Sequence, residues 1–445
     1  MKFNILCLFA GMLPVLCAQQ LSERGVLRVS LQRAVEIGLS PEGSVAIQLA
    51  REDTRQAQAK SMAARAELLP DLDGTASVQS QTRNLSAMGL QFDQVAPGLN
   101  IPRSVGPYNV FDARFTIDQS ILDLSSIRRF QASKIGVKAA RTTEADTKDQ
   151  AAARISRLYV AALRAEASQA AVKENIRLAE AVLKQAESLN TAGTGTGIEV
   201  TRARVLLANE NQRRLVAEND LNQARQELMR AMGVSPSIDL ELTDELAYVL
   251  PEVKTLDQWR EIALKSRSDL QAQMEKQDQA RMSSSASKLE RMPTVKGFAD
   301  YGSLGTGVDS AVPTRSVGFS VNVPIFDGGR RQSRILESDS KHRQEQIRTH
   351  DLRDQIETQL QLALDSLHSA EQEVNVAQEG LSLSEREMDQ ARHRYTSGVA
   401  TSVEVADAQA RLSQARDNRV AALYRHNLAR LNLADATGTI QSFVQ

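Results

Sequence analysis

The sequence predicts a mainly α-helical protein with a small β part, in which one long helical hairpin occurs twice. The first observation is a repeat: residues 191–203 match residues 396–408 at an offset of 205, which pairs Gly193 with Gly398. The second is a heptad seam, because long stretches beside these repeats place apolar residues at alternating three- and four-residue steps. The third is composition. A chain with 42% apolar but only 4% aromatic residues suits an elongated, Ala-rich body better than a compact core.

Residues 1–18 have the layout of a secretory signal peptide, with Lys2, an apolar run to residue 17 and Ala18 at the cleavage point. The apolar run of about 15 residues is too short to span a bilayer as a helix. Cys17 is alternatively the lipidated cysteine of a bacterial lipoprotein, although Leu16 stands where such signals have a small residue. Both cysteines, Cys7 and Cys17, lie in this segment, so a chain cleaved after Ala18 has neither disulfides nor thiolate metal sites.

The first repeat covers residues 27–233 and opens with two helical segments. Ser30 is expected to cap a helix that begins at Leu31. A Ser-Pro-Glu-Gly break follows, and a second helical pattern runs over about 44–69. Pro70 ends that pattern, since the residue before a proline disfavours the helical conformation.

Alternating apolar residues then predict a strand pair within about 72–121, around a loop at 84–109. After it the period becomes helical, and a long helix leads to a tip at about 191–198. The return helix ends at Gly233. The seam of the first long helix consists of Ile155, Leu158, Ala162, Ala165, Val172, Ile176, Ala179, Leu183 and Ala186.

A connector at 234–255 leads to the second repeat, 256–438. Its first helix is expected to break near residues 266–268. A second strand pair within about 295–325 surrounds a shorter loop at 302–314.

Asp327 is the expected N-cap of the second long helix, which leads to a tip at about 396–403; residues 439–445 form a tail. The lone tryptophan, Trp259, is expected to pack near the connector. A seam as long as the second one needs packing against its own repeat or other subunits. It consists of Ile356, Leu360, Ala363, Leu367, Ala370, Val374, Ala377, Leu381, Met388, Ala391 and Tyr395.

Several function classes are disfavoured. The chain has 54 basic and 55 acidic residues, so no single-sign field would attract nucleic acid. The glycines at 193–197 lie between two helices with no preceding strand, which argues for a turn and against a dinucleotide site. We therefore expect no enzyme activity, no cofactor and no metal. Five histidines lack metal-ligand spacing, which favours surface positions: His342, His350, His368, His393 and His426.

Residues 27–438 resemble the TolC-type outer membrane efflux proteins, or outer membrane factors. The likeness lies in the order of elements, which occurs twice: helix, proline, strand pair, long helix, glycine tip and return helix. Two short motifs add to this resemblance: Pro-Ile-Phe-Asp-Gly-Gly-Arg at 324–330 and Leu-Gln-Arg-Ala-Val at 31–35. The resemblance implies a homotrimer with a trimeric α-helical tunnel through the periplasm. Four strands per subunit would enter a twelve-stranded transmembrane β-barrel in the outer membrane of a Gram-negative-type bacterium.

The resemblance also implies a role and partners. The trimer would contact outer membrane lipid and act as a passive conduit of a tripartite efflux or type I secretion system. A periplasmic adaptor (membrane fusion) protein and an inner-membrane pump would dock at its far end. The alternative is a soluble periplasmic coiled-coil adaptor or scaffold protein. Such an adaptor would carry one hairpin, whereas here the strand pairs are duplicated and remote from the tips. No feature of the sequence names the cargo or the class of pump.

Three positions depart from the family pattern. Ser40-Pro41 and Ser268-Asp269 stand where an Asn-Pro or Arg-Pro pair is usual, and Ser120 replaces the proline found at Pro324.

The resemblance assigns the periplasmic gate to Glu404 and Asp407, one turn after the second tip, with Tyr395 and Glu199 helping to hold it closed. Ala400 stands where the family has a constraining arginine, so closure would be weaker or arranged differently. Each assignment has a plainer alternative: a first-turn carboxylate favoured by the helix dipole, or an ordinary seam or cap residue. The residues expected to contact the adaptor, or simply to turn the chain, are Gly193, Thr194, Gly195, Thr196, Gly398, Val399, Ala400 and Thr401.

Overall fold

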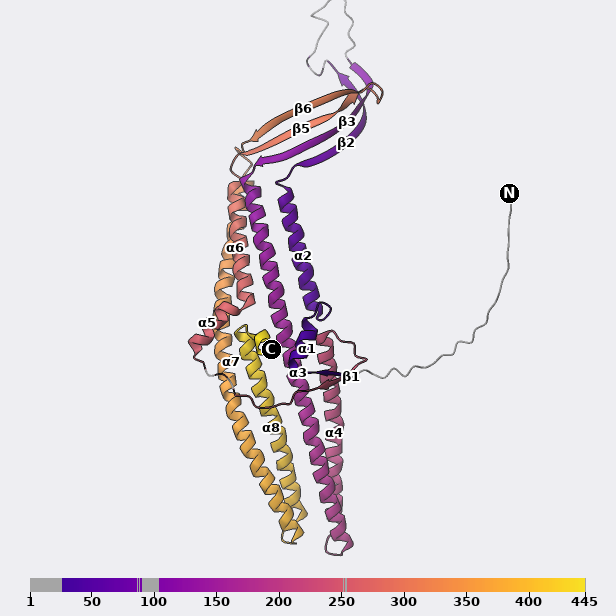
Figure 1. Ribbon diagram of the computed structural model, residues 1–445, viewed down its shortest axis with the longest axis vertical. Coiled ribbons are helices and arrows are strands. Elements are labelled where there is room, and N and C mark those ends of the chain that lie inside the picture. Colours follow the sequence, from indigo (N-terminus) through magenta and orange to yellow (C-terminus); the bar gives the residue numbers. More distant parts are fainter. Residues whose placement is uncertain are drawn as a thin grey trace, which may run out of the picture.

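The computed structural model describes residues 26–85, 87, 89, 104–250, 252 and 254–444. The expected signal peptide at 1–18, most of the expected first loop and Gln445 lie outside the described residues. Figure 1 shows an elongated molecule with a β-sheet at one end and the tips of two long helical hairpins at the other.

The described chain is mainly helical, with a small β part, as predicted. Its helices are α1 (Leu31–Leu39), α2 (Val45–Ala66), α3 (Leu124–Thr191), α4 (Gly197–Met232), α5 (Leu256–Ser266), α6 (Ser268–Leu289), α7 (Arg330–Thr396), α8 (Ser402–Ala436) and α9 (Ile440–Val444). Its strands are β1 (Val26–Val29), β2 (Asp71–Asn84), β3 (Ser104–Leu122), β4 (Asp239–Leu242), β5 (Thr294–Gly305) and β6 (Val312–Asn322).

The two longest helices set the length of the molecule. With 68 residues in α3 and 67 in α7, each is about 100 Å long. In Figure 1, α3 and α4 form one hairpin and α7 and α8 the other, and both extend to the same end. The duplicated hairpin expected from the 205-residue repeat is therefore present.

Local signals predicted most helix ends correctly. The Ser30 hydroxyl accepts a hydrogen bond from the Arg33 N–H at 3.2 Å, at the start of α1. α5 and α6 are separated at Arg267, where a break was expected. Gly233 ends α4 with φ of 75°, a conformation that favours glycine.

The start of α7 differs from the prediction. Gly329 holds the cap position of this helix, whereas Asp327 lies two residues further from it. The Asp327 carboxylate nevertheless accepts hydrogen bonds from the N–H groups of Gly329 at 3.2 Å and Arg331 at 3.0 Å. Two glycines with positive φ, Gly328 and Gly329, make this wider turn possible.

A four-stranded antiparallel sheet in the order β2-β3-β5-β6 unites the two predicted strand pairs. The strands are longer than expected: β3 begins at Ser104, and the second loop shrinks to residues 306–311. β6 ends at Asn322, so the prediction that it reaches Ile325 is wrong. Pro324 has no N–H for a ladder, which explains the early end.

The register gives this sheet two different faces. Cross-strand partners such as Val78 with Phe111, Phe115 with Tyr301, and Ala299 with Val317 all lie on one face. That face is mainly apolar, with Arg315 beside Tyr301 as an exception. Its apolar members are Leu72, Ala76, Val78, Phe111, Ala113, Phe115, Ile117, Val295, Ala299, Tyr301, Val317, Phe319 and Val321.

The opposite face is mainly polar, although Phe298 and Leu304 also lie on it. Arg114 forms ion pairs there with Asp112 at 2.7 Å and Asp300 at 3.4 Å. Its other polar members include Asp71, Asp73, Thr75, Ser77, Gln79, Thr116, Asp118, Lys296, Ser316 and Ser320.

The main core lies midway along the molecule, where α1, α3, α4, α8 and the β1–β4 pair meet. Tyr159 is fully buried at its centre. Its hydroxyl lies 2.8 Å from Asp244 Oδ2 and 3.1 Å from the Val29 carbonyl oxygen. Burial, reinforced by Asp244, raises the pKa of the Tyr159 hydroxyl above its ordinary value.

Two features of this middle region were not foreseen. The connector contains β4, which pairs in parallel with β1. His426 is fully buried rather than at the surface, and its Nε2 lies 2.9 Å from the carbonyl oxygen of Val249 in the connector. Its burial follows from the connector crossing α8, a tertiary contact that helical spacing does not reveal. Trp259 is buried beside the connector, as expected.

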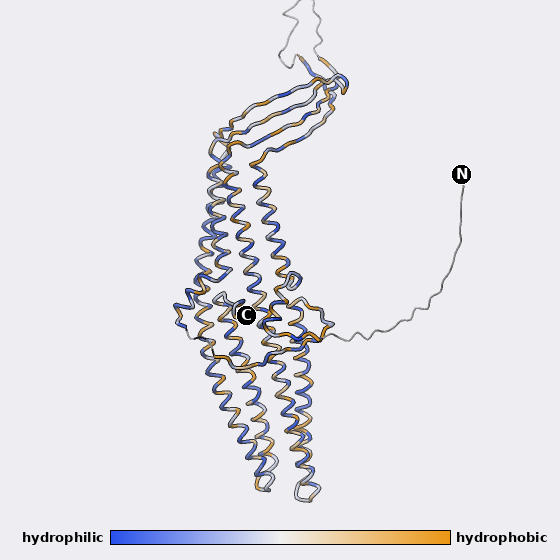
Figure 2. Tube along the Cα trace, viewed as in Figure 1, coloured by the Kyte–Doolittle hydropathy of each residue, from blue (hydrophilic) through white to orange (hydrophobic). Residues whose placement is uncertain are grey.

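Polar and apolar residues alternate along the long helices in Figure 2. Within the described ranges, the structure contains no helix that is both long and apolar enough to cross a membrane.

Candidate functional site at the hairpin tips

The first tip turns through a left-handed glycine. Gly193 has φ of 76°, and the N–H groups of Thr194 and Gly195 both return to the Leu189 carbonyl oxygen, at 3.1 and 2.9 Å. This arrangement satisfies carbonyl groups that the end of α3 would leave unpaired. A Cβ on Gly195 would lie 2.9 Å from the Asn190 nitrogen, whereas one on Gly193 would meet open space. Gly195 is therefore required for packing and Gly193 for its backbone conformation.

The second tip repeats this geometry. Gly398 has φ of 72°, and the N–H groups of Val399 and Ala400 return to the Arg394 carbonyl oxygen at 3.0 and 3.2 Å. A Cβ on Gly398 would also meet open space, and the Val399 side chain is exposed. Both tips thus present small or exposed side chains on a tightly hydrogen-bonded turn.

Glu199 closes the N-terminal end of α4. Its carboxylate accepts a hydrogen bond from the Thr196 N–H at 3.0 Å, which satisfies a donor at the helix start. The plainer alternative for Glu199, a cap residue, is thus present in the structure.

A small hydrophobic core joins the two tips within the chain. Tyr395 is 6% exposed there, and its hydroxyl has no hydrogen-bond partner in the described chain. Burial, with a smaller effect of Glu199, raises the pKa of the Tyr395 hydroxyl. Gln185 adds one polar link by donating to the Thr396 hydroxyl at 3.3 Å. The buried members of this core are Val182, Ala186, Val200, Ala203, Leu381, Met388, Ala391, Tyr395, Val405, Ala408 and Leu412.

The two acidic residues expected at the gate differ in their surroundings. Glu404 Oε1 lies 3.0 Å from Nε of Arg394, so an ion pair bridges the base of the second tip. Asp407 is exposed and has no hydrogen bond or ion pair among the residues described. Arg394 was not singled out in the sequence. Arg394 lies four residues before Gly398, and Glu404 lies six residues after it. At this spacing an antiparallel hairpin brings the two side chains together across the turn.

A polar cluster ties the two hairpins together between the tips and the main core. Asn175 of α3 donates to the Ser413 hydroxyl of α8 at 2.9 Å and accepts from Arg416 at 2.6 Å. Arg213 of α4 donates to Ser413 and to Asp417. Asn175 is 1% exposed, so its amide is satisfied by these bonds rather than by water. We call these five residues the inter-hairpin cluster; no pattern in the sequence predicts it.

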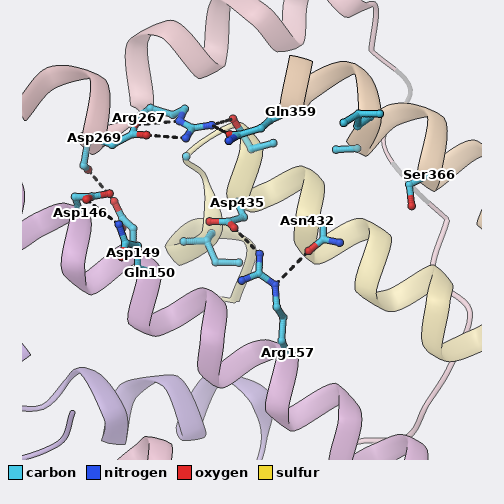
Figure 3. A pocket seen from close by; sticks show the side chains of 16 residues that line it. Asp146, Asp149, Gln150, Arg157, Arg267, Asp269, Gln359, Ser366, Asn432 and Asp435 are labelled. Carbon is cyan, nitrogen blue, oxygen red and sulfur yellow. Dashed lines mark hydrogen bonds and ion pairs between the residues drawn. The ribbon is translucent and has the colours of Figure 1, made fainter. Parts of the chain in front are cut away.

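A polar pocket of about 430 Å³ lies where the repeats meet (Figure 3). Arg157 of α3 donates to Asp435 of α8 and, at 3.2 Å, to Asn432. Arg267 contacts both carboxylate oxygens of Asp269, at 3.0 and 2.6 Å. Both arginines thus have carboxylate partners. We therefore interpret the pocket as a contact between the two repeats, called the joint below.

Asp146 lines the same joint. Its carboxylate accepts a hydrogen bond from Gln150 at 2.9 Å. Burial, followed by the nearby carboxylates of Asp269 and Asp149, raises the pKa of Asp146 above its usual range. Among the described residues, no group of three or more histidine, cysteine, aspartate or glutamate side chains is placed to hold a metal ion.

Comparison with known proteins gives consistent matches. The pattern of the family described as outer membrane efflux protein matches residues 39–234 and 259–439. The chain is 23% identical over 344 residues to the proteases secretion protein PrtF of Dickeya chrysanthemi, covering 75% of this chain and 74% of that protein. It is 27% identical over 305 residues to the outer membrane efflux protein BepC of Brucella suis biovar 1 (strain 1330), covering 67% and 64%.

The fold is that of a solved channel. The CmeC outer membrane channel of Campylobacter jejuni superposes with a TM-score of 0.77 at 18% identity, covering 92% of this chain and 85% of that one. The family match covers far more than half of the sequence and includes both hairpins with their tips. This chain is therefore a member of the outer membrane efflux protein family, and its location is the outer membrane.

Proposed function

We propose that the protein is the outer membrane channel of a tripartite efflux or type I secretion system. In this proposal three copies form a passive conduit that carries cargo from a periplasmic adaptor and an inner-membrane pump to the exterior. The family supports transport through the outer membrane; the trimer, its partners and its passive mechanism are the proposal.

The observation that carries the proposal is the two-faced sheet. Among the described residues, large side chains of its apolar face lie exposed: Val317, Phe319 and Val78 are 81%, 75% and 71% exposed. Large contiguous apolar surfaces are rare on soluble monomers. Strands of 11 to 19 residues are long enough for a tilted transmembrane strand, which needs roughly 9–11 residues. A lipid-facing apolar side and a water-facing polar side fit this surface.

The free edges of the sheet support closure by further copies. Among the described strands, β2 and β6 are paired on one side only. Unpaired backbone groups are very costly in lipid, so an inserted sheet must close on itself. Edge pairing of β6 with β2 of the next copy would do so, and three copies would supply twelve strands, four from each.

The long helices support the same assembly. An exposed apolar stripe runs along α7 at spacings of 11, 15, 14 and 7 residues, which keeps its members on one side of the helix. Neighbouring copies in a tunnel would cover this stripe. Its members are Leu336, Ile347, Leu362, Val376 and Leu383.

We assign the periplasmic gate to Glu404 and Asp407, with Tyr395 and Glu199 in its support. Three copies would bring six carboxylates together, and the three of Asp407, which are not paired with Arg394, would favour cations in a pore. Ala400 has no side chain that could hold the gate closed. In this proposal the ion pair between Arg394 and Glu404 restrains the second tip instead. The tip residues Gly193 to Thr196 and Gly398 to Thr401 are the proposed adaptor contact, because small side chains allow another helical tip to approach closely.

The soluble adaptor or scaffold alternative gains no support from the sheet, since a soluble protein would expose its apolar face to water. The relatives are named for secretion of proteases and for efflux, and we propose no single cargo.

Membrane fractionation with gel analysis of unheated and heated samples tests the proposal. We expect the mature protein in the outer membrane fraction, as a trimer that heating converts to monomer. A protein that stays soluble and monomeric would rule the channel out.

A further inference from the structure

A second pocket lies in the middle region, between the connector and helices α5, α7, α8 and α9. Its volume is about 300 Å³, at the small end of the range for small-molecule sites, roughly 300–1,000 Å³. All of its walls belong to one chain, so the inference below does not depend on the proposed function. The lining includes Leu250, Trp259, Ile262, Leu367, Leu433 and Phe443.

Arg430 is the unusual member of this pocket. Its guanidinium lies 5.0 Å from the centre of the Phe443 ring, and among the described residues it has no hydrogen bond and no ion pair. Burial alone lowers the pKa of Arg430, with no carboxylate to oppose the effect. A partly buried cation without an anion is unfavourable, so an anion bound in the pocket would stabilise Arg430.

The other charged side chains of the pocket neutralise each other. Nζ of Lys254 lies 2.6 Å from the Glu252 carboxylate and 4.5 Å from the centre of the Trp259 ring. With one acid and two bases, the lining carries one positive charge in excess, and that charge is on Arg430.

Beside this charge stand an aromatic wall and hydroxyl groups. Trp259 and Phe443 both line the pocket, each with a cation over one ring face, and the Ser442 hydroxyl donates to the Thr439 carbonyl oxygen at 2.8 Å. The lining thus combines one anion-binding group with a large apolar surface. A guanidinium binds a carboxylate through two parallel hydrogen bonds, and the rings suit an apolar body.

We propose that this pocket binds a small amphiphilic carboxylate, an apolar ring or short chain that carries a single acid group, with Arg430 on the carboxylate and Trp259 against the apolar part. A bound ligand would join the connector and α5 to α8 and α9.

Trp259 is the only tryptophan of the sequence, so its fluorescence reports on this pocket alone. The probe is 3-(4-bromophenyl)propionate, whose bromine quenches tryptophan on contact, added to the full-length protein in detergent. The matched control ligand is the corresponding amide, which has the same shape but no charge. We expect saturable quenching by the acid and at least tenfold weaker quenching by the amide, since hydrogen bonds to charged groups are the strong ones.

Three variants locate the effect. Arg430→Met should weaken acid binding at least tenfold. Arg425→Met, which removes an exposed arginine of the same helix that pairs with Glu373, should bind as the parent does. Ser442→Glu, at an exposed position, should abolish acid binding by offering Arg430 a competing carboxylate, and it tests the idea even if Arg430→Met fails to fold.

Two results would overturn the inference. Equal quenching by acid and amide would mean simple partitioning of an apolar ring. Unchanged acid affinity in both Arg430→Met and Ser442→Glu would mean that the guanidinium does not bind the ligand, and absence of quenching would mean that the pocket takes no such acid.

Discussion

Replacing Asp407 by asparagine should weaken cation block of the channel much more than removing the neighbouring ion pair. Asp407 is exposed and has no partner in the described chain, whereas Glu404 is bound to Arg394. In each subunit the pair is neutral, so the net charge of the proposed ring comes from Asp407. Asparagine keeps the shape of the side chain and removes that charge.

The size of the effect follows from Coulomb's law. A divalent cation about 6 Å from one carboxylate gains roughly 1.4 kcal/mol in water. Physiological salt reduces this by about half. Three subunits then contribute about 2 kcal/mol, which corresponds to roughly a 30-fold higher blocking concentration in the variant.

Single-channel conductance in a planar bilayer, titrated with a divalent cation, measures that concentration. The matched control removes two charges and keeps the net charge: Arg394→Gln combined with Glu404→Gln should stay within about threefold of the parent. Glu404→Ala with Asp407→Ala should abolish block and lower cation selectivity. Parental block in the Asp407→Asn variant would refute the reasoning, and Asp407 would then be an ordinary surface residue beyond the first turn of α8.

Four further outcomes are expected. Tyr159→Phe should cost about 1.5–3 kcal/mol of unfolding free energy in a denaturant titration, because the hydroxyl bonds a carboxylate; an unchanged midpoint would contradict this. Gly398→Val should abolish efflux while trimers persist in the membrane, since its positive φ is strained for a branched residue; equal loss of trimer would assign the glycine to folding alone. Asp146→Asn should raise the melting temperature at pH 7 but not near pH 3, because a carboxyl whose folded pKa is raised costs stability as pH rises above its unfolded value near 3.8; a gain at pH 3 as large as at pH 7 would contradict this. Val308→Cys, in the turn between β5 and β6, should react with an impermeant reagent on intact cells; reaction only after the outer membrane is broken would reverse the topology.

Features with local causes were predictable from the sequence. The glycines of the repeat, Gly193 and Gly398, both adopt the left-handed conformation because each ends a helix at a tight turn. The second seam is almost entirely buried, since a heptad pattern requires a partner along its length. Ser30 caps its helix because a hydroxyl at that position can reach a free N–H.

Features that depend on distant contacts were not predictable. β1 and β4 have four residues each, and more than 200 residues separate them, so neither has a pattern long enough to stand out. His426 is buried only because the connector passes over it. Asn175 looks like a polar interruption of a helix, and only the approach of Ser413 and Arg416 from α8 makes it a link between hairpins. Arg394 could have been recognised from its spacing to Glu404 across the tip.

The most direct test of the account is the environment of the two faces of β6. The sequence has no cysteine after residue 17, so Val317→Cys and Ser316→Cys each provide one labelling site on neighbouring residues of opposite faces. With a polarity-sensitive fluorophore in lipid vesicles, we predict blue-shifted emission at residue 317 that nitroxide-labelled lipids quench, and water-like, unquenched emission at residue 316. Water-like emission at both positions would contradict an inserted sheet, and with it the proposed channel.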